Sequence, residues 1–159
     1  MDLAPEESYY FCKLGDCYFR AGFPDLAYES FRQAIRRRPE YAWYHYKLAD
    51  AYFRTGHVLL AVESYRNAIR YSPLDDYYHV CLAAAYLVAD RVPEAMAVFE
   101  RTVQIRPRNA CYRYLLAELL EAAGYPEAAA EHYHAAGELD SYDLDYIERV
   151  KDRVNGSRR

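Results

Sequence analysis

The sequence has few residues that interrupt helices and no apolar run long enough to cross a membrane. Only 6 glycines and 7 prolines occur among its 159 residues, so long helices can form between them. No apolar stretch approaches the ~20 residues of a membrane-spanning helix. The first eight residues are acidic and lack the basic region and apolar core of a secretion signal. We therefore expect no membrane insertion and no secretion leader.

Cysteine is also scarce, and its spacing is not that of a metal or redox site. The 4 cysteines, Cys12, Cys17, Cys81 and Cys111, include no C-x-x-C pair. Free thiols are typical of a reducing compartment, so we expect a cytoplasmic protein. The formal net charge of −4 disfavours nucleic acid as a partner. The basic run Arg36 to Arg38 falls at the end of an expected helix, where cations complement the helix dipole.

What the sequence has in abundance is internal repetition. Residues of the same kind recur every 34 positions in four series. These series are Tyr10, Tyr44, Tyr78 and Tyr112; Leu14, Leu48, Leu82 and Leu116; Ala27, Ala61, Ala95 and Ala129; and Phe31, Tyr65, Phe99 and Tyr133. Pro39, Pro73 and Pro107 close the first three units. A fixed period of this length indicates a repeat architecture, in which each unit buries its apolar face against the next.

The first of these 34-residue repeats resembles the tetratricopeptide repeat. Its matching residues are Leu14, Gly15, Tyr18, Gly22, Ala27, Phe31, Ala34 and Pro39. The resemblance implies an all-α, right-handed α-solenoid of four helix-turn-helix repeats, at about 8–41, 42–75, 76–109 and 110–141. It also implies a protein-interaction scaffold and not an enzyme.

Glycines and prolines divide each repeat into a first and a second helix. We expect the first helices near 8–21, 42–55, 76–89 and 110–123, and the second near 24–37, 58–71, 92–105 and 126–139. Residues 142–154 carry a narrow apolar stripe on a charged segment and are expected to form a C-terminal capping helix. Residues 1–154 would then form a single domain, followed by a flexible tail, 155–159.

A helical wheel separates two faces on each first helix. The recurring residues form the packing face, which includes Tyr10, Tyr44 and Tyr78. The opposite face should be solvated, yet it carries aromatic residues, which is typical of a binding surface. In the family that the chain resembles, this face lines a concave groove. The predicted groove residues are Tyr9, Asp16, Phe19, Arg20, Trp43, Tyr46, Lys47, Asp50, Phe53, Arg54, Tyr77, Val80, Ala84, Leu87, Tyr114 and Glu118.

We expect binding to centre on the aromatic residues Trp43, Tyr46 and Phe53. Because Phe53 faces outward on the wheel, its replacement by alanine should cost less stability than that of Tyr52. The charged residues of the face are open to two interpretations. Asp16 with Arg20, and Asp50 with Arg54, are spaced to form ion pairs within one helix, or they contact a ligand.

Two specific functions find no support in the residues. A tetratricopeptide subfamily holds C-terminal carboxylates with basic and amide side chains, but here those positions include Cys12, Asp16, Asp50, Tyr77 and Cys81. No phosphate loop, metal motif or nucleophile signature occurs, so we expect no catalytic residue, metal or cofactor. His132 and His134 face different directions on a helix.

The sequence therefore predicts an adaptor that binds a protein or peptide segment with apolar anchors in the concave groove. Basic residues of such a peptide could meet Asp16 or Asp50. Two alternatives stay open: a small chaperone for a secreted or membrane-inserting substrate, and a scaffold that self-associates through its groove.

Overall fold

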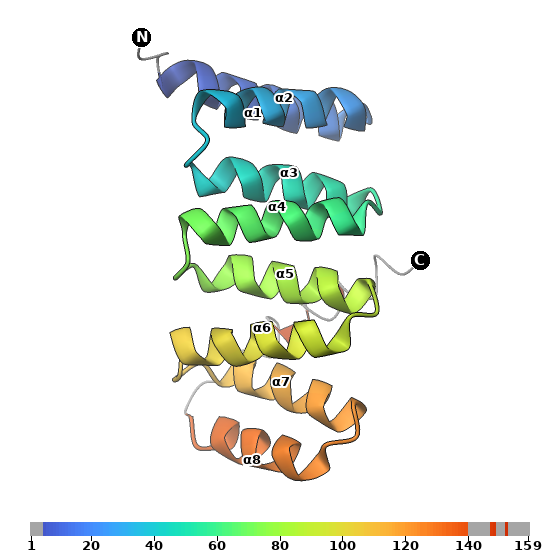
Figure 1. Ribbon diagram of the computed structural model, residues 1–159, viewed down its shortest axis with the longest axis vertical. Coiled ribbons are helices and arrows are strands. Elements are labelled where there is room, and N and C mark those ends of the chain that lie inside the picture. Colours follow the sequence, from blue (N-terminus) through green and yellow to red (C-terminus); the bar gives the residue numbers. More distant parts are fainter. Residues whose placement is uncertain (1–4, 140–146, 149–151, 153–159) are drawn as a thin grey trace. The chain divides into compact units, whose positions relative to one another are not determined.

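The computed structural model describes residues 5–139, 147–148 and 152, and within these ranges it consists of helices joined by short turns (Figure 1). The described residues form eight helices: α1 (Pro5–Arg20), α2 (Pro24–Arg37), α3 (Ala42–Arg54), α4 (Val58–Tyr71), α5 (Asp76–Val88), α6 (Val92–Ile105), α7 (Ala110–Ala122) and α8 (Pro126–Gly137). All eight agree with the predicted ranges to within a few residues. None of these helices is long and apolar enough to span a membrane.

Prolines begin three of the even-numbered helices, as predicted. Pro24 begins α2 and Pro126 begins α8, while Pro93 lies in the first turn of α6. The first backbone N–H groups of a helix have no partner within it, so proline loses no hydrogen bond there.

The turn between the two helices of each repeat needs a left-handed residue. Gly22, Gly56 and Gly124 adopt φ angles of 84°, 83° and 88°. This region is accessible to glycine and costly for residues with a Cβ atom. In the third repeat Asp90 occupies the same position with a φ of 59°.

Replacing Asp90 by glycine is therefore expected to stabilise the protein by about 0.5–1 kcal/mol, because the strained backbone loses its Cβ atom. Thermal melting followed by circular dichroism measures this gain. The same substitution at Asp25, in the first turn of α2, is the control and should destabilise. A lower melting temperature for Asp90→Gly would show that the aspartate side chain stabilises this turn.

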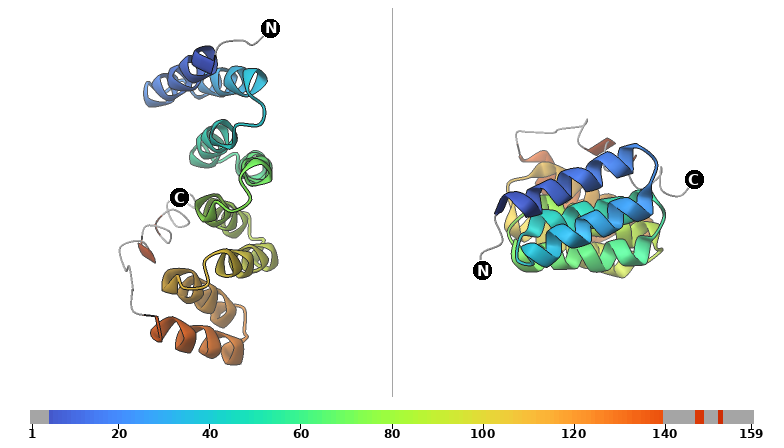
Figure 2. Two further views of the ribbon diagram at one scale, coloured as in Figure 1. Left: turned by 90° about the vertical axis from the view of Figure 1, so that its left-hand side faces the viewer. Right: turned by 90° about the horizontal axis from the view of Figure 1, so that it is seen from above.

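The chain divides into two compact units, Met1–Tyr78 and His79–Arg159, with the boundary inside α5. In each unit the odd-numbered helices lie on one side and the even-numbered helices on the other (Figure 2). The assignment of 1–154 to one domain stays a prediction.

Large aromatic residues of the even-numbered helices fill the interior, as the repeat pattern predicted. Phe31 in α2, Tyr65 in α4 and Phe99 in α6 are fully buried. Small residues face them where two helices approach closely. At Gly15 of α1 an added Cβ would lie only 2.6 Å from Cε1 of Phe31. Helices α1 and α2 are therefore in close contact at Gly15.

One part of the predicted packing face is wrong. Tyr10 of α1 is 63% exposed, whereas its equivalent Tyr44 of α3 is 2% exposed. Leu14 is likewise exposed and Leu48 is buried. Helix α3 packs against α2, and the hydroxyl of Tyr44 is hydrogen-bonded to that of Ser8 on α1, but no described helix precedes α1. The repeat position therefore does not by itself determine burial.

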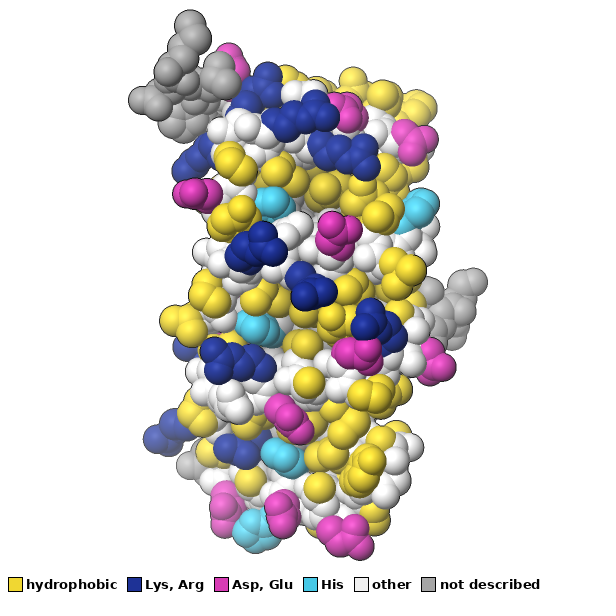
Figure 3. Space-filling model, in the orientation of Figure 1, with side chains coloured by type: hydrophobic (Ala, Val, Ile, Leu, Met, Phe, Trp, Pro, Cys, Tyr) yellow, Lys and Arg dark blue, Asp and Glu magenta, His cyan; other side chains and the backbone are white. Residues whose placement is uncertain are grey.

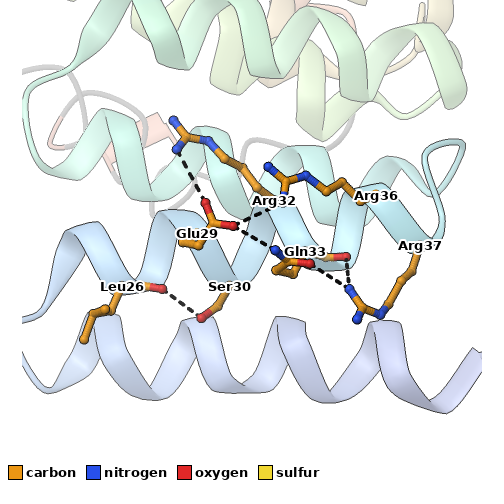
Figure 4. A network of polar contacts seen from close by, with 7 residues as sticks. All are labelled: Leu26, Glu29, Ser30, Arg32, Gln33, Arg36 and Arg37. Atoms are coloured by element: carbon orange, nitrogen blue, oxygen red, sulfur yellow. Dashed lines mark hydrogen bonds and ion pairs between the residues drawn. The ribbon is translucent and has the colours of Figure 1, made fainter.

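The basic run at the end of α2 is engaged within the first unit (Figure 4). Glu29 accepts from Arg36 over 3.3 Å and lies 4.0 Å from Arg32. Arg37 donates to Gln33 and pairs with Glu7 over 3.3 Å. Figure 3 shows Lys and Arg side chains gathered over the region of α1 and α2. The arginines of the basic run stabilise the end of a helix, as the sequence indicated.

The predicted capping helix and tail lie outside the described residues, except for Ile147, Glu148 and Asp152. Ile147 is fully buried in a hydrophobic cluster of the second unit, together with Val80, Leu115 and Leu116.

Candidate functional site

The first unit contains a hollow of about 320 Å³ between α1 and α3. Six predicted groove residues line it: Asp16, Phe19, Arg20, Lys47, Asp50 and Arg54. Lys13, Ala51 and the ring of Phe31 complete the lining. Residues three, four and seven positions apart share one face of a helix, which places Lys13, Asp16 and Arg20 together on α1. The same spacing places Lys47, Asp50 and Arg54 together on α3.

Ion pairs cross this hollow as well as following its helices. Nζ of Lys47 on α3 lies 2.6 Å from Oδ1 of Asp16 on α1. The predicted pair of Asp50 with Arg54 forms at 4.0 Å. The other predicted pair, Asp16 with Arg20, does not form an ion pair. Asp16 pairs instead with Lys47 of the neighbouring helix. Arg54 lies over the ring of Phe19 at 4.8 Å, so its guanidinium faces the hollow.

The lining carries an excess of positive charge. It contains four cations, Lys13, Arg20, Lys47 and Arg54, and two carboxylates, Asp16 and Asp50. Both carboxylates already have a cation beside them. No carboxylate of the described residues forms an ion pair with Lys13 or Arg20. The hollow therefore attracts negative charge, although the chain as a whole has a net charge of −4.

Aromatic residues continue from this hollow along the same unit. Lys47 lies 5.7 Å from the centre of the Trp43 ring, which is 5.0 Å from that of Tyr46. The hydroxyl groups of Tyr46 and Tyr77 are 3.3 Å apart. Trp43 is 44% and Tyr77 42% exposed. Tyr9, also exposed, lies beneath Lys13 on α1. Exposed rings thus flank the charged hollow.

The prediction that Tyr46 and Phe53 are solvated is wrong. Phe53 is 2% exposed and packs against Tyr65 of α4. Tyr46 is buried among Tyr65, Tyr77 and Tyr78. A wheel assigns burial to one side of a single helix, but α3 is enclosed by helices on several sides. These two rings support the groove from within.

In the second unit the predicted groove residues are largely covered. Val80 and Ala84 of α5 are buried, in contrast to the prediction, while Leu87, Tyr114 and Glu118 are partly buried. The hydrophobic cluster that contains Val80 also contains Ile147, which lies far along the chain. The sequence pattern could not show that this later residue packs there.

Sequence reasoning missed Lys13 as a lining residue. Its repeat position is that of Lys47, 34 residues later, which was assigned to the groove. That recurrence was the available signal, together with its spacing of three from Asp16 and seven from Arg20.

Cys12 is buried beside the hollow-lining residue Lys13 on α1 and is not suited to nucleophilic chemistry. Burial, with a smaller contribution from Asp16, raises the pKa of its thiol to about 11. The thiolate is the nucleophilic form of cysteine, and at neutral pH this thiol stays protonated.

Comparison with protein families decides the assignment of the repeat. A model described as "Tetratricopeptide repeat" matches residues 46–110, and a model described as "TPR repeat" matches residues 15–56. Together these matches extend over more than half of the chain. The chain belongs to the tetratricopeptide repeat family. The matched residues include all of α3 and the last part of α1, which line the hollow of the first unit.

Solved tetratricopeptide repeat structures share the fold of this protein. The crystal structure of MamA has a TM-score of 0.74 and 22% identity, covering 86% of this chain and 80% of that chain. The structure of MamA from Desulfovibrio magneticus RS-1 has a TM-score of 0.68 and 19% identity, and the match covers 94% of this chain and 78% of that chain. The first tetratricopeptide repeat domain of Spaghetti (RPAP3), bound to the HSP90 peptide SRMEEVD, has a TM-score of 0.65 and 20% identity. That match covers 76% of this chain and 98% of that chain. At these identities the similarity shows the fold.

Comparison with curated protein sequences finds no significant match. The tetratricopeptide family match and the shared fold support the general role of a protein-interaction scaffold.

Proposed function

We propose that this tetratricopeptide repeat protein binds a peptide segment of a partner in the groove of its first two repeats, and that acidic residues of the peptide enter the charged hollow. The carrying observation is the excess of cations in that hollow, where Lys13 and Arg20 form no ion pair with a described carboxylate. The segment can be extended or helical.

This proposal changes the expected chemistry of the ligand. Asp16 and Asp50 are already engaged by Lys47 and Arg54, so a basic peptide would have to break these pairs. A peptide carboxylate instead meets two cations that are available. Charge-assisted hydrogen bonds to a carboxylate are about twice as strong as neutral ones, and arginine can bind a carboxylate with two parallel bonds.

Apolar contact has a separate place beside the hollow. The exposed faces of Trp43 and Tyr77 can pack against an apolar side chain of the peptide, while buried Tyr46 holds both rings from behind. Aromatic residues commonly supply much of the energy of an interface. The favoured ligand thus combines glutamate or aspartate with an apolar anchor.

The test uses Trp43, the single tryptophan of the chain, as a reporter. A short peptide of glutamate and leucine should change its fluorescence saturably, and a matched peptide of lysine and leucine should not. The double variant Lys13→Glu, Arg20→Glu should weaken binding about tenfold or more, since it replaces attraction by repulsion at both cation positions. Added salt should weaken binding because part of the attraction is electrostatic.

The matched control is the double variant Arg66→Glu, Arg70→Glu, which makes the same charge change at exposed positions of α4 and should bind as the wild type does. The proposal fails if the lysine peptide binds as tightly, or if both double variants lose binding equally. SRMEEVD, the peptide in the Spaghetti structure, is a useful comparison. It carries both acidic residues and the apolar residues methionine and valine, so the proposal expects it to bind.

A further inference from the structure

The second unit contains another hollow, of about 710 Å³, between α6 and α7. Its walls are apolar and include Leu87, Met96, Leu119 and Ala123. Tyr125, at the start of α8, lies at its edge and is 57% exposed. Figure 3 shows hydrophobic surface over this part of α6 and α7. This site is separate from the groove of the first unit.

The equivalent positions two repeats earlier show which side chains lie between the corresponding helices there. Two repeats earlier, Tyr28 stands at the position of Met96 and Tyr52 at that of Leu120. Their ring centres lie 4.5 Å apart, and the hydroxyl oxygen of Tyr28 lies 2.5 Å from that of Thr55. In the first unit, two aromatic rings in tilted contact therefore lie between α2 and α3.

Each of these interactions is lost in the second unit. Ala123 stands in place of Thr55 and cannot form its hydrogen bond. Met96 replaces Tyr28, lines the hollow and lacks a flat ring, whereas Leu120, which replaces Tyr52, is buried in the hydrophobic cluster. The ring of Tyr28 thus has no counterpart at Met96, where the lining is apolar apart from Glu100. Its chemistry suits an aromatic side chain, which stacks readily against Tyr125.

The charged residue at the edge of the hollow also differs between the two units. In the first unit Arg32 donates to the hydroxyl of Tyr52 over 2.6 Å. The equivalent residue beside the second hollow is Glu100, the one charged residue of its described lining. No cation of the described residues forms an ion pair with Glu100. A ligand that carries a cation would supply the charge that this edge lacks.

We propose that this hollow docks a partner peptide that presents an aromatic side chain and a cation one helical turn apart. The spacing follows that of Tyr28 and Arg32, which lie four residues apart on α2. The ring enters between Met96 and Tyr125, and the cation pairs with Glu100. This preference is opposite in charge to that proposed for the first unit's groove.

The chain provides a specific reporter for this site. It contains 2 methionines, Met1 and Met96, so carbon-13 labelling of methionine methyl groups gives one signal in the hollow and one reference. The probe is the acetylated and amidated peptide Tyr-Ala-Ala-Ala-Arg. A ring beside the Met96 methyl group should shift its signal saturably, and the Met1 signal should stay unchanged. Peptides with alanine for tyrosine or glutamate for arginine should cause little shift.

Two variants test the proposed contacts. Glu100→Arg keeps the reporter and should weaken probe binding about fivefold, the scale of an exposed charge pair that becomes repulsive. Met96→Tyr restores the residue of the first unit, fills the hollow, and should weaken binding of a fluorescein-labelled probe about 30-fold or more, as loss of an anchor pocket does. Ala130→Tyr, at an exposed position of α8, is the matched control and should bind normally.

The proposal is overturned if the Met96 signal does not move up to the solubility limit of the probe. It is also overturned if the alanine peptide causes the same shift, or if Met96→Tyr, folded by circular dichroism, binds as the wild type does. A Met96 signal that shifts with protein concentration alone would assign the hollow to a second copy of the chain instead.

Discussion

Replacing Phe53 by alanine is expected to destabilise the first unit by about 3–5 kcal/mol, the usual cost of removing a buried aromatic side chain. The ring is 2% exposed and packs against Tyr65 of α4. Its removal leaves a cavity that α3 and α4 cannot close without moving the aromatic residues around it. This expectation reverses the one from the helical wheel, by which Phe53 would matter less than Tyr52. Both residues are buried, so we now expect comparable losses.

Fluorescence of Trp43 during unfolding in guanidinium measures this loss in the first unit. The tryptophan lies on the same helix as Phe53, so its signal reports on that unit even if the two units unfold separately. Leu59→Ala is the control, because Leu59 is 69% exposed, and it should change the free energy of unfolding by less than about 0.5 kcal/mol. A loss for Phe53→Ala as small as that of the control would contradict the packing described here.

Replacing Gly15 by valine is expected to destabilise the first unit by about 1–3 kcal/mol, the usual cost of overpacking. The first added carbon would already lie 2.6 Å from the ring of Phe31, well inside a normal contact. That ring is fully buried, so it has little room to move. Gly15→Ala should cost less, because it adds one carbon and improves helix propensity by up to about 1 kcal/mol.

A double-mutant cycle identifies the cause. In a Phe31→Leu background the smaller side chain makes room for the new carbon atoms, and Gly15→Val should then cost markedly less than in the wild type. Unfolding followed by Trp43 fluorescence again gives the free energies. Equal costs in the two backgrounds would show that the glycine matters for a reason other than its contact with Phe31.

The helices and their pairing could be predicted because the repeat supplies the same information four times. Prolines and turn glycines mark each boundary through local backbone geometry, which depends on neighbouring residues only. Even the substitution of Asp90 for a turn glycine preserved the positive φ angle. The large residue of each second helix could likewise be assigned to the interior from its recurrence.

The candidate site was predicted less completely. Asp16, Arg20, Lys47, Asp50 and Arg54 were placed in the groove, and the structure brings them together in one hollow. Their partners were not predictable, because Asp16 pairs with a residue 31 positions away on another helix. The excess of positive charge follows from this pairing, and so does the change in expected ligand from basic to acidic.

The sequence by itself determined the family, the helices, the turns and the set of residues that recur at helix contacts, because these depend on local geometry and on a period that can be read directly. Only the tertiary structure decided which recurring residues are buried. Tyr10 and Tyr44 share a repeat position, yet Tyr10 is exposed, whereas Tyr44 is buried and hydrogen-bonded to Ser8 of α1. Met96 and Tyr28 share another repeat position, yet Met96 borders a hollow, whereas Tyr28 packs against the ring of Tyr52. Burial and charge pairing depend on the neighbouring helices. These neighbours differ for the first described helix, which no described helix precedes, and for a repeat whose adjacent residues differ from those of the other repeats.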